Sequence, residues 1–439
     1  MRRRLNAYLT RSAMAAAIAF HLWGGGAGCM SAQTLTVAPD HILLDELATI
    51  RATELRPGEH VTIEAELTDG EGQKWASEAE FVADTAGTVD VSQQAPVAGS
   101  YKREVAAMGL IWSMSPRDKH VAAYEAPSDL SAQSIELRLA LNGQTVSTAR
   151  LSQTPLSDDI HRVTVHGELH GILFLPGSNE PHPGVLVLGG SEGGIPLRKA
   201  AWLASRGYAA FALAYFRYEN LPSNLESIPL EYFGQALEWM IERSDIMPGG
   251  IAVVGTSRGA ELALQLGSMF PQVRTVVAYS PANSLHPACC GGALSVPYAW
   301  TWRGRPLYFS PRGARPGTEA MTKAAIHVER IRGPILLISG DKDGVWPSTK
   351  MADAVVERLK QAKFPYTFVH LKYHDAGHRV GRPGIEPAWQ YKVRNPVTGK
   401  VVDVGGTVSG NAHSSLDAMP RVLEFLHQAF LSNSPVSKR

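Results

Sequence analysis

Five uninterrupted apolar segments in the C-terminal part of the chain constrain its fold more than any other feature. Such segments are typical of parallel strands that are buried on both faces, and helical patterns such as 230–243 lie between them. Strands that alternate with helices predict a mostly parallel sheet covered by helices on both sides, which is an α/β fold. The five segments are 185–188, 209–213, 251–254, 275–278 and 335–338.

The part of the chain before residue 152 has a different periodicity. Segments 61–67 and 135–141 alternate apolar and polar residues, which is the pattern of strands with one buried face. Asn142-Gly143 follows the second segment and is a hairpin-turn signal. Short strands at this spacing predict a β-sandwich domain over 34–152 and a separate α/β domain over 157–432.

The N-terminal residues have the pattern of an export signal. Arg2, Arg3 and Arg4 precede the apolar run 13–20, which is too short to span a bilayer. We interpret 1–32 as a signal peptide and expect an exported, periplasmic chain. Cleavage before Cys29 would instead leave a cysteine for lipidation, and this is the only membrane attachment that we expect. A cytoplasmic chain with a frayed N-terminus is the alternative.

Composition excludes several other classes of protein. The 42 basic and 41 acidic side chains nearly cancel, whereas nucleic-acid binding needs a basic face, so we expect no nucleic-acid partner. Three cysteines are too few for a disulfide framework and lack zinc-site spacing, so we expect no metal and no cofactor. Adjacent cysteines seldom bridge, and Cys289 and Cys290 are expected to be a buried apolar pair or a reactive one.

Two turns match G-x-S-x-G, the pattern of a nucleophile elbow, and both follow a buried strand. The turn 255–259 precedes a helix of small residues two strand–helix units after the first turn, so we predict Ser257 as the nucleophile. The turn 189–193 lies where this architecture places N–H groups for an oxyanion, which makes Ser191 the weaker candidate nucleophile. We assign the oxyanion contacts to the backbone N–H groups of Arg258, Gly190, Ser191 and Glu192.

A serine nucleophile needs a base, and the base needs a group that orients it. Asp341 and Asp343 both follow the strand 335–338, and we prefer Asp343 because the turn after the strand gives it room to face the site. His378, in a loop beyond a late strand, is the predicted base, whereas His374 is interpreted as a hydrogen-bonded loop histidine. The order Ser257, Asp343, His378 is the order found in α/β-hydrolases.

Longer segments resemble the family of acyl-CoA thioesterases and bile acid-CoA:amino acid N-acyltransferases. The resemblance extends from about residue 37 to 430 and is carried by segments such as 83–90, 108–114, 214–222 and 343–348. It implies an Ig-like sandwich followed by an α/β-hydrolase domain, and a serine acyl-enzyme mechanism with the roles on Ser257, Asp343 and His378. Family members with cysteine at the elbow resemble acyltransferases, so serine at this position favours hydrolysis by water.

These observations predict an acyl-CoA thioesterase that releases a fatty acid and CoA. One alternative is a periplasmic carboxylesterase or lactonase with the same three residues. Another, of a different class, is a non-catalytic envelope protein that binds a partner. Arginines between Trp302 and Arg315 either contact the CoA phosphates or belong to a solvated loop.

Overall fold

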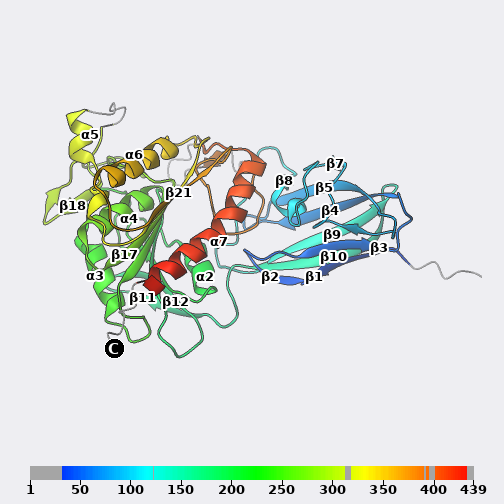
Figure 1. Cartoon of the computed structure of the whole chain (residues 1–439), viewed down its shortest axis with the longest axis horizontal. Helices are drawn as coiled ribbons and strands as arrows, with labels where there is room; N and C mark the ends of the chain where they lie inside the picture. Colours follow the sequence, from blue (N-terminus) through cyan, green and yellow to red (C-terminus); the bar gives the residue numbers. More distant parts are fainter. Residues whose placement is uncertain (1–31, 122, 312–317, 390–391, 395–400, 433–439) are drawn as a thin grey trace, which may run out of the picture. The chain divides into compact units, whose positions relative to one another are not determined.

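The computed structural model describes residues 32–121, 123–311, 318–389, 392–394 and 401–432 (Figure 1). The described residues from Gln33 to Ser432 belong to one compact unit. Residues 1–31 of the predicted leader, Cys29 among them, lie outside the described residues, as do Arg312 and Arg315. Among the described residues, no helix combines the length and the apolar character that crossing a membrane requires.

The N-terminal region consists of two β-sheets. The three-stranded sheet has the order β1-β3-β6, and the larger sheet has the order β2-β10-β9-β4-β5-β7, with β8 paired to β5. The smaller sheet comprises β1 (Thr34–Ala38), β3 (Thr49–Thr53) and β6 (Val89–Asp90). The larger comprises β2 (His41–Leu43), β4 (His60–Thr68), β5 (Lys74–Val82), β7 (Ala98–Gly99), β8 (Ser115–Pro116), β9 (Gln133–Leu141) and β10 (Gln144–Thr154).

Alternating burial explains how these sheets form. Along β4 every second residue is buried, from Val61 to Leu67, as its sequence period predicts. The buried residues of both sheets belong to one hydrophobic cluster. Asn142 and Gly143 join β9 to β10 with φ angles of 50° and 78°, the left-handed conformation that a tight hairpin turn requires.

The C-terminal region is built on an eight-stranded sheet of order β11-β12-β14-β13-β16-β17-β20-β21. β11 and β12 form an antiparallel hairpin, β12 pairs antiparallel with β14, and the remaining neighbours are parallel. The strands are β11 (His161–Val165), β12 (His170–Leu175), β13 (Gly184–Leu188), β14 (Ala209–Ala214), β16 (Ile251–Thr256), β17 (Val273–Tyr279), β20 (Ile335–Gly340) and β21 (Phe368–Tyr373). This is an α/β-hydrolase-type sheet, as predicted.

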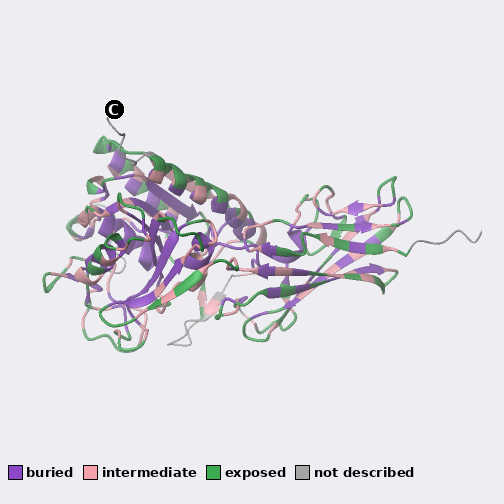
Figure 2. Ribbon diagram, turned by 90° about the horizontal axis from the view of Figure 1, so that it is seen from below, coloured by how far each residue is buried: buried purple, intermediate pink, exposed green. Residues whose placement is uncertain are grey.

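Helices cover both faces of this sheet. Val185 and Val187 of β13 share a cluster with α2 (Leu197–Ala204) and α7 (Val408–Ser432). Leu186 and Leu188 point the other way, into a cluster with α3 (Glu231–Ile241), α4 (Arg258–Met269) and α6 (Ser348–Gln361). β13 is consequently buried along its whole length, whereas β4 of the N-terminal region alternates between buried and more accessible residues (Figure 2).

Short elements complete the described chain. A small sheet joins β15 (Ile228–Pro229), β18 (Trp300–Trp302) and β19 (Arg305–Pro306), and a hairpin joins β22 (Lys392–Arg394) to β23 (Val401–Asp403). The remaining helices are α1 (Gly109–Trp112), α5 (Glu319–Ala324) and the 3-10 turn η1 (Val328–Arg330).

Candidate active site

Ser257 stands at the junction of β16 and α4. It is the residue before the first turn of α4, with φ 57° and ψ −117°, a backbone conformation that non-glycine residues rarely adopt. Its N–H donates to the carbonyl of Tyr279 on β17 at 2.8 Å, which fixes the turn to the neighbouring strand. The serine thus lies at the carboxyl end of the parallel strands, on a sharp strand–turn–helix element.

Glycines at the two ends of this turn permit very close backbone contacts. A Cβ atom on Gly255 would lie 2.0 Å from the carbonyl oxygen of Gly259. A Cβ on Gly259 would lie 2.3 Å from the carbonyl oxygen of Gly189, in the other G-x-S-x-G turn. Side chains cannot be accommodated at such distances, so the pattern of glycines follows from the tightness of the elbow.

Three of the predicted residues are brought together by hydrogen bonds. His378 Nε2 lies 2.9 Å from Ser257 Oγ, and His378 Nδ1 lies 2.8 Å from Asp343 Oδ2. The Asp343 side chain is 1% exposed, and its other oxygen accepts the N–H groups of Val345 at 2.9 Å and Trp346 at 3.1 Å. The carboxylate is therefore fixed by its own turn and faces the imidazole.

The loop that carries His378 is held by two backbone contacts. The N–H of His378 donates to the carbonyl of Val404 at 2.7 Å, and its carbonyl accepts the hydroxyl of Ser280 at 2.6 Å. The indole of Trp346 meets the imidazole edge to face at 5.5 Å. These contacts fix the ring between the serine and the carboxylate.

The other candidate acid and base lie nearby but form a separate pair. Asp341 Oδ2 is 2.6 Å from His374 Nδ1, and Asp341 Oδ1 accepts the N–H of Asp375 at 2.8 Å. His374 is thus a hydrogen-bonded loop histidine, as interpreted from the sequence, and Asp341 binds the loop that carries it.

The predicted oxyanion donors differ in the hydrogen bonds that their backbone N–H groups already make. Arg258 is the first residue of α4, and the first N–H groups of a helix have no partner inside the helix. The N–H of Gly190, by contrast, already donates to the carboxylate of its near neighbour Glu192 at 3.0 Å. In this conformation Gly190 is not free to bind an oxyanion, and the Glu192 side chain would first have to move.

Lys199 of α2, which the sequence did not point to, is partly buried against the end of β16 that leads into the nucleophile turn. Lys199 Nζ donates to Thr256 Oγ1 at 2.6 Å and sits 3.4 Å from the centre of the Tyr279 ring. Burial lowers the pKa of Lys199 to about 7, although the nearby charge of Glu192 favours the protonated form. No sequence motif points to Lys199, because its contacts join segments that are distant in the chain.

A buried charged network supports the residue that follows the nucleophile. The Glu261 carboxylate, fully buried in α4, lies 3.2 Å from the Arg258 guanidinium and 2.8 Å from His286 Nδ1. It also accepts the indole N–H of Trp300 at 2.8 Å. Burial alone would raise the pKa of Glu261, but Arg258 and His286 outweigh it and hold that pKa below its usual value.

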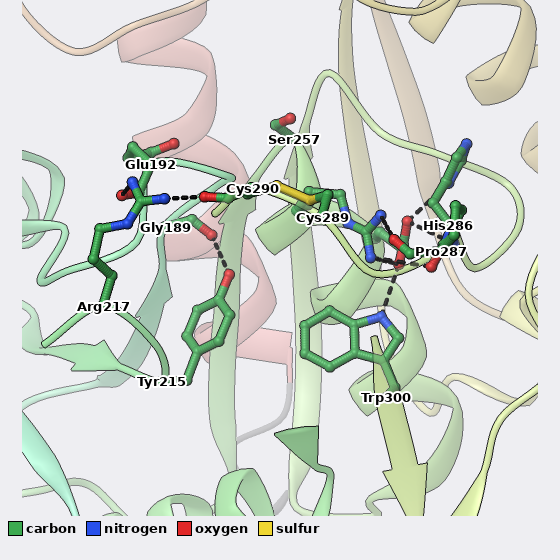
Figure 3. Close-up of a disulfide and its surroundings, with 12 residues drawn as sticks. Gly189, Glu192, Tyr215, Arg217, Ser257, His286, Pro287, Cys289, Cys290 and Trp300 are labelled. Carbon is green, nitrogen blue, oxygen red and sulfur yellow. Dashed lines mark hydrogen bonds and ion pairs between the residues drawn. A yellow bond between two sulfur atoms is a disulfide. The ribbon is translucent and has the colours of Figure 1, made fainter. Parts of the chain in front are cut away.

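Cys289 and Cys290 form a disulfide, so the expectation that these neighbours do not bridge is wrong (Figure 3). Both residues are half-buried. Cys290 has φ 82°, in the left-handed region, and this turn of the backbone allows adjacent cysteines to join. Such a conformation is uncommon for a side-chain-bearing residue, which is why the sequence alone favoured separate thiols.

Two groups of described side chains bring three metal-ligating atoms within 4.8 Å of one another, namely His166, His170 and Glu219, and Asp341, His374 and Asp375. In the first group His170 Nδ1 is already 2.9 Å from a Glu219 oxygen, and in the second His374 is paired with Asp341. Each group thus already contains a hydrogen bond between a histidine and a carboxylate, and we assign no metal to either.

Comparison with solved structures gives low overall similarity. A Mycobacterium tuberculosis puromycin-hydrolyzing peptidase is 14% identical with a TM-score of 0.42, and the match covers 83% of this chain and 53% of that one. Esterase B from Lactobacillus rhamnosis is 14% identical with a TM-score of 0.38, over 64% of this chain and 91% of that one.

Curated relatives match over most of their length. Bile acid-CoA:amino acid N-acyltransferase of Mus musculus is 28% identical over 415 residues, which cover 90% of this chain and 98% of that protein. Acyl-coenzyme A thioesterase 6 of the same organism is 28% identical over 92% of this chain and 98% of its own. Acyl-coenzyme A thioesterase 1 of Homo sapiens is also 28% identical, over 88% of this chain and 93% of its own.

Two family models match the chain. Residues 45–167 match the acyl-CoA thioester hydrolase/BAAT N-terminal region, and residues 228–288 and 312–432 match the BAAT/acyl-CoA thioester hydrolase C-terminal region. Together these matches span well over half of the sequence and include Ser257, Asp343 and His378. The chain therefore belongs to the acyl-CoA thioester hydrolase/BAAT family.

Proposed function

We propose that this chain hydrolyses acyl-CoA thioesters to a fatty acid and CoA through an acyl-enzyme on Ser257. The observation that carries the proposal is the pair of hydrogen bonds from His378 to Ser257 and to Asp343, at 2.9 and 2.8 Å. Relatives named as acyl-CoA thioesterases support the substrate class.

In the acylation step, Ser257 Oγ attacks the thioester carbonyl while His378 Nε2 accepts the hydroxyl proton. Asp343 holds the Nδ1–H tautomer and stabilises the imidazolium that forms. The carbon–sulfur bond then breaks, and His378 returns the proton to the departing thiolate. The acyl group remains on the serine oxygen as an ester.

The negative charge on the carbonyl oxygen needs preorganised donors. The N–H of Arg258 at the start of α4 is one, and the N–H groups of Ser191 and Glu192 on the neighbouring loop supply others. Each such donor contributes on the order of 3 kcal/mol to the stabilisation of the transition state. Gly190 joins them once the Glu192 carboxylate has left its N–H.

Water completes the cycle, activated by His378 in the same way as the serine was. Some relatives are named as N-acyltransferases, which pass the acyl group to an amino acid instead. The serine at 257 supports water as the acceptor in this chain, because the resemblance links cysteine at this position to acyl transfer.

A substrate panel tests the proposal. We expect a higher kcat/KM for decanoyl-CoA than for the matched oxygen ester, p-nitrophenyl decanoate, and no acyl-glycine product when glycine is added. A preference for the oxygen ester would favour a carboxylesterase or lactonase. Failure of a fluorophosphonate probe to label Ser257, with no turnover of any substrate, would favour a non-catalytic binding protein.

Two further assignments extend the proposal. We propose an Ig-like topology for the two N-terminal sheets, and export to the periplasm directed by residues 1–32, with Cys29 as an alternative lipid anchor. The N-terminal mass of the native chain from fractionated cells tests export and lipidation. An unprocessed N-terminus in the cytoplasmic fraction would contradict export.

The arginine segment after Trp302 is a separate point. Arg303 and Arg305 are exposed, which fits a solvated loop as well as a contact with CoA.

A further inference from the structure

The disulfide Cys289–Cys290 lies in the segment 286–290 (Figure 3). Hydrogen bonds at both ends of this segment connect it to the two backbone elements that carry the proposed oxyanion donors, the start of α4 and the loop after β13. At one end, Arg258 donates to the carbonyl oxygens of Pro287 at 2.9 Å and His286 at 3.2 Å. Arg258 directly follows the serine, and its backbone N–H is a proposed oxyanion donor. The segment therefore carries contacts that orient this first residue of α4.

At the other end, Arg217 joins the segment to the loop after β13, which carries the other proposed oxyanion donors. Arg217 donates through Nη2 to the carbonyl of Cys290 and through Nη1 to the carbonyl of Glu192, the latter at 2.7 Å. The Nε atom of Arg217 is buried without a hydrogen-bond partner among the described residues, and within that part of the chain the two carbonyls are the acceptors of its side chain. The position of the Glu192 loop is thus coupled to the direction of the Cys290 carbonyl.

The disulfide restrains the direction of the Cys290 carbonyl. A bond between neighbouring cysteines closes a small ring that contains their peptide bond, so the backbone torsions on either side of this bond are restricted together. Cys290 is held at φ 82°, which side-chain-bearing residues rarely adopt without a constraint. When the ring opens, nothing covalent keeps Cys290 in this region, and its carbonyl is free to turn away from Arg217.

We propose that Cys289–Cys290 is a redox modification site, reduced by a dithiol, that sets the rate of the reaction at Ser257. The oxidised chain is the fast form and the reduced chain the slow form. The inference rests on the proposed function, because it concerns the start of α4 and the loop after β13, whose backbone N–H groups are proposed to bind the oxyanion. Both cysteines are half-buried, which leaves them accessible to attack by a small dithiol.

Reduction follows ordinary thiol–disulfide exchange. One thiolate of the dithiol attacks a cysteine sulfur, the sulfur–sulfur bond breaks, and the other cysteine leaves as a thiolate that takes up a proton. The second thiol of the reductant, as its thiolate, then attacks the reductant's own sulfur in the mixed disulfide, which closes a cyclic disulfide and releases the attacked cysteine as a thiolate that takes up the second proton. Two electrons and two protons pass to the cysteine pair, and an oxidant of the disulfide class reverses the reaction.

The test measures kcat in both redox states of the full chain carrying Cys29→Ser, so that only Cys289 and Cys290 can report. The substrate is p-nitrophenyl butyrate, because a dithiol would itself cleave a thioester. Iodoacetamide labelling with mass spectrometry establishes the state of the cysteines. Reduction with dithiothreitol is expected to lower kcat about three- to tenfold, as small displacements of catalytic groups do, and reoxidation should restore it.

Two variants provide controls. The double variant Cys289→Ser/Cys290→Ser should have the low kcat of the reduced chain and should not respond to dithiothreitol. Arg217→Lys keeps the charge but cannot reach both carbonyls in the same way, so we expect a reduced kcat that responds less to reduction. Reduction of the unsubstituted cysteine pair stays decisive if the double variant does not fold.

The outcomes separate this inference from the proposed function. Equal kcat for the oxidised and fully reduced chains, with Ser257 labelled by a fluorophosphonate in both, overturns the redox inference and leaves the hydrolase intact. Cysteines that are alkylated before any reduction also overturn it, as does a loss of activity that accompanies global unfolding by circular dichroism. Absence of labelling and turnover in every state overturns the proposed function itself.

Discussion

The turns 189–193 and 255–259 share the G-x-S-x-G pattern, and each follows a strand of the same sheet, β13 or β16, whose residues are buried except for Thr256 at the end of β16. They differ in what comes next. After Ser257 the helix α4 begins at once, whereas after the first turn the helix α2 begins only at Leu197. Ser257 is bonded to His378, while the first turn contributes the Glu192 carbonyl to Arg217 and the Gly190 N–H to Glu192.

This difference shows that the pattern alone does not define a nucleophile. A serine becomes reactive when its turn leads directly into a helix and when later loops supply a base and a carboxylate. The same glycine-rich pattern without these partners is proposed to make a loop of backbone donors. The predictions below test this division of roles, from the largest expected effect to the smallest.

Removal of the two serine hydroxyls should give the largest contrast. Ser257→Ala is expected to lower kcat/KM for decanoyl-CoA by roughly 10⁴-fold or more, because covalent catalysis is lost. Ser191→Ala should change it by no more than about threefold, since the backbone N–H is proposed to act there and not the hydroxyl. Steady-state kinetics on both variants decide the matter. Comparable losses in the two would reverse our assignment of the turns.

The two candidate carboxylates should differ by nearly as much. In Asp343→Asn the amide can donate to His378 Nδ1 and so favour the wrong tautomer, and kcat should fall by roughly 10³- to 10⁴-fold. Asp341→Asn loses only the exposed contact with His374 and should leave kcat within about twofold. The measurement is kcat for the same thioester at neutral pH. A large loss in Asp341→Asn would contradict the proposed roles.

The first glycine of each turn should behave differently as well. Gly255→Ala would bring its Cβ to 2.0 Å from the Gly259 carbonyl, and we expect a loss of about 1–3 kcal/mol in the free energy of unfolding. Gly189→Ala meets its nearest atom at 3.6 Å, an ordinary contact, and should change stability by less than about 0.5 kcal/mol. Urea titrations of both variants test this. Equal stability would mean that the elbow is looser than its geometry indicates.

The sequence predicted the parts of the molecule that depend on local pattern. The alternation in β4 and the continuous apolar run of β16 each require one kind of burial, so strand type and fold class followed from periodicity. The order of Ser257, Asp343 and His378 was also readable, because each residue follows a strand whose carboxyl end faces the same edge of the sheet.

Contacts between distant segments were not predictable in this way. Arg217 and Cys290 are 73 positions apart, and no periodicity indicates that a guanidinium reaches that carbonyl. The disulfide depends on a positive φ at Cys290, which the residue type disfavours. The Gly190 N–H was expected to be free, but its bond to Glu192 is a side-chain conformation that a motif does not specify.

A pH-dependent effect is expected from Lys199, which lies in α2 and contacts the end of β16. Burial lowers its pKa from 10.5 to about 7 in the folded chain. Between these values the unfolded chain binds more protons than the folded chain, so this residue should make folding more favourable as the pH rises above 7. The gain is at most about 1.4 kcal/mol per pH unit. Below pH 7 both states are protonated, and the contribution of Lys199 no longer changes with pH.

Lys199→Met isolates this contribution because it keeps the length of the side chain and removes the charge. The free energy of unfolding, measured by urea titration at pH 7 and pH 9, should rise less with pH in the variant than in the unsubstituted chain. Lys350→Met, at an exposed position of α6, is the matched control and should follow the unsubstituted chain. Identical pH dependence in all three chains would mean that the Lys199 ammonium is fully solvated, and that α2 and β16 approach each other less closely than the Lys199–Thr256 hydrogen bond requires.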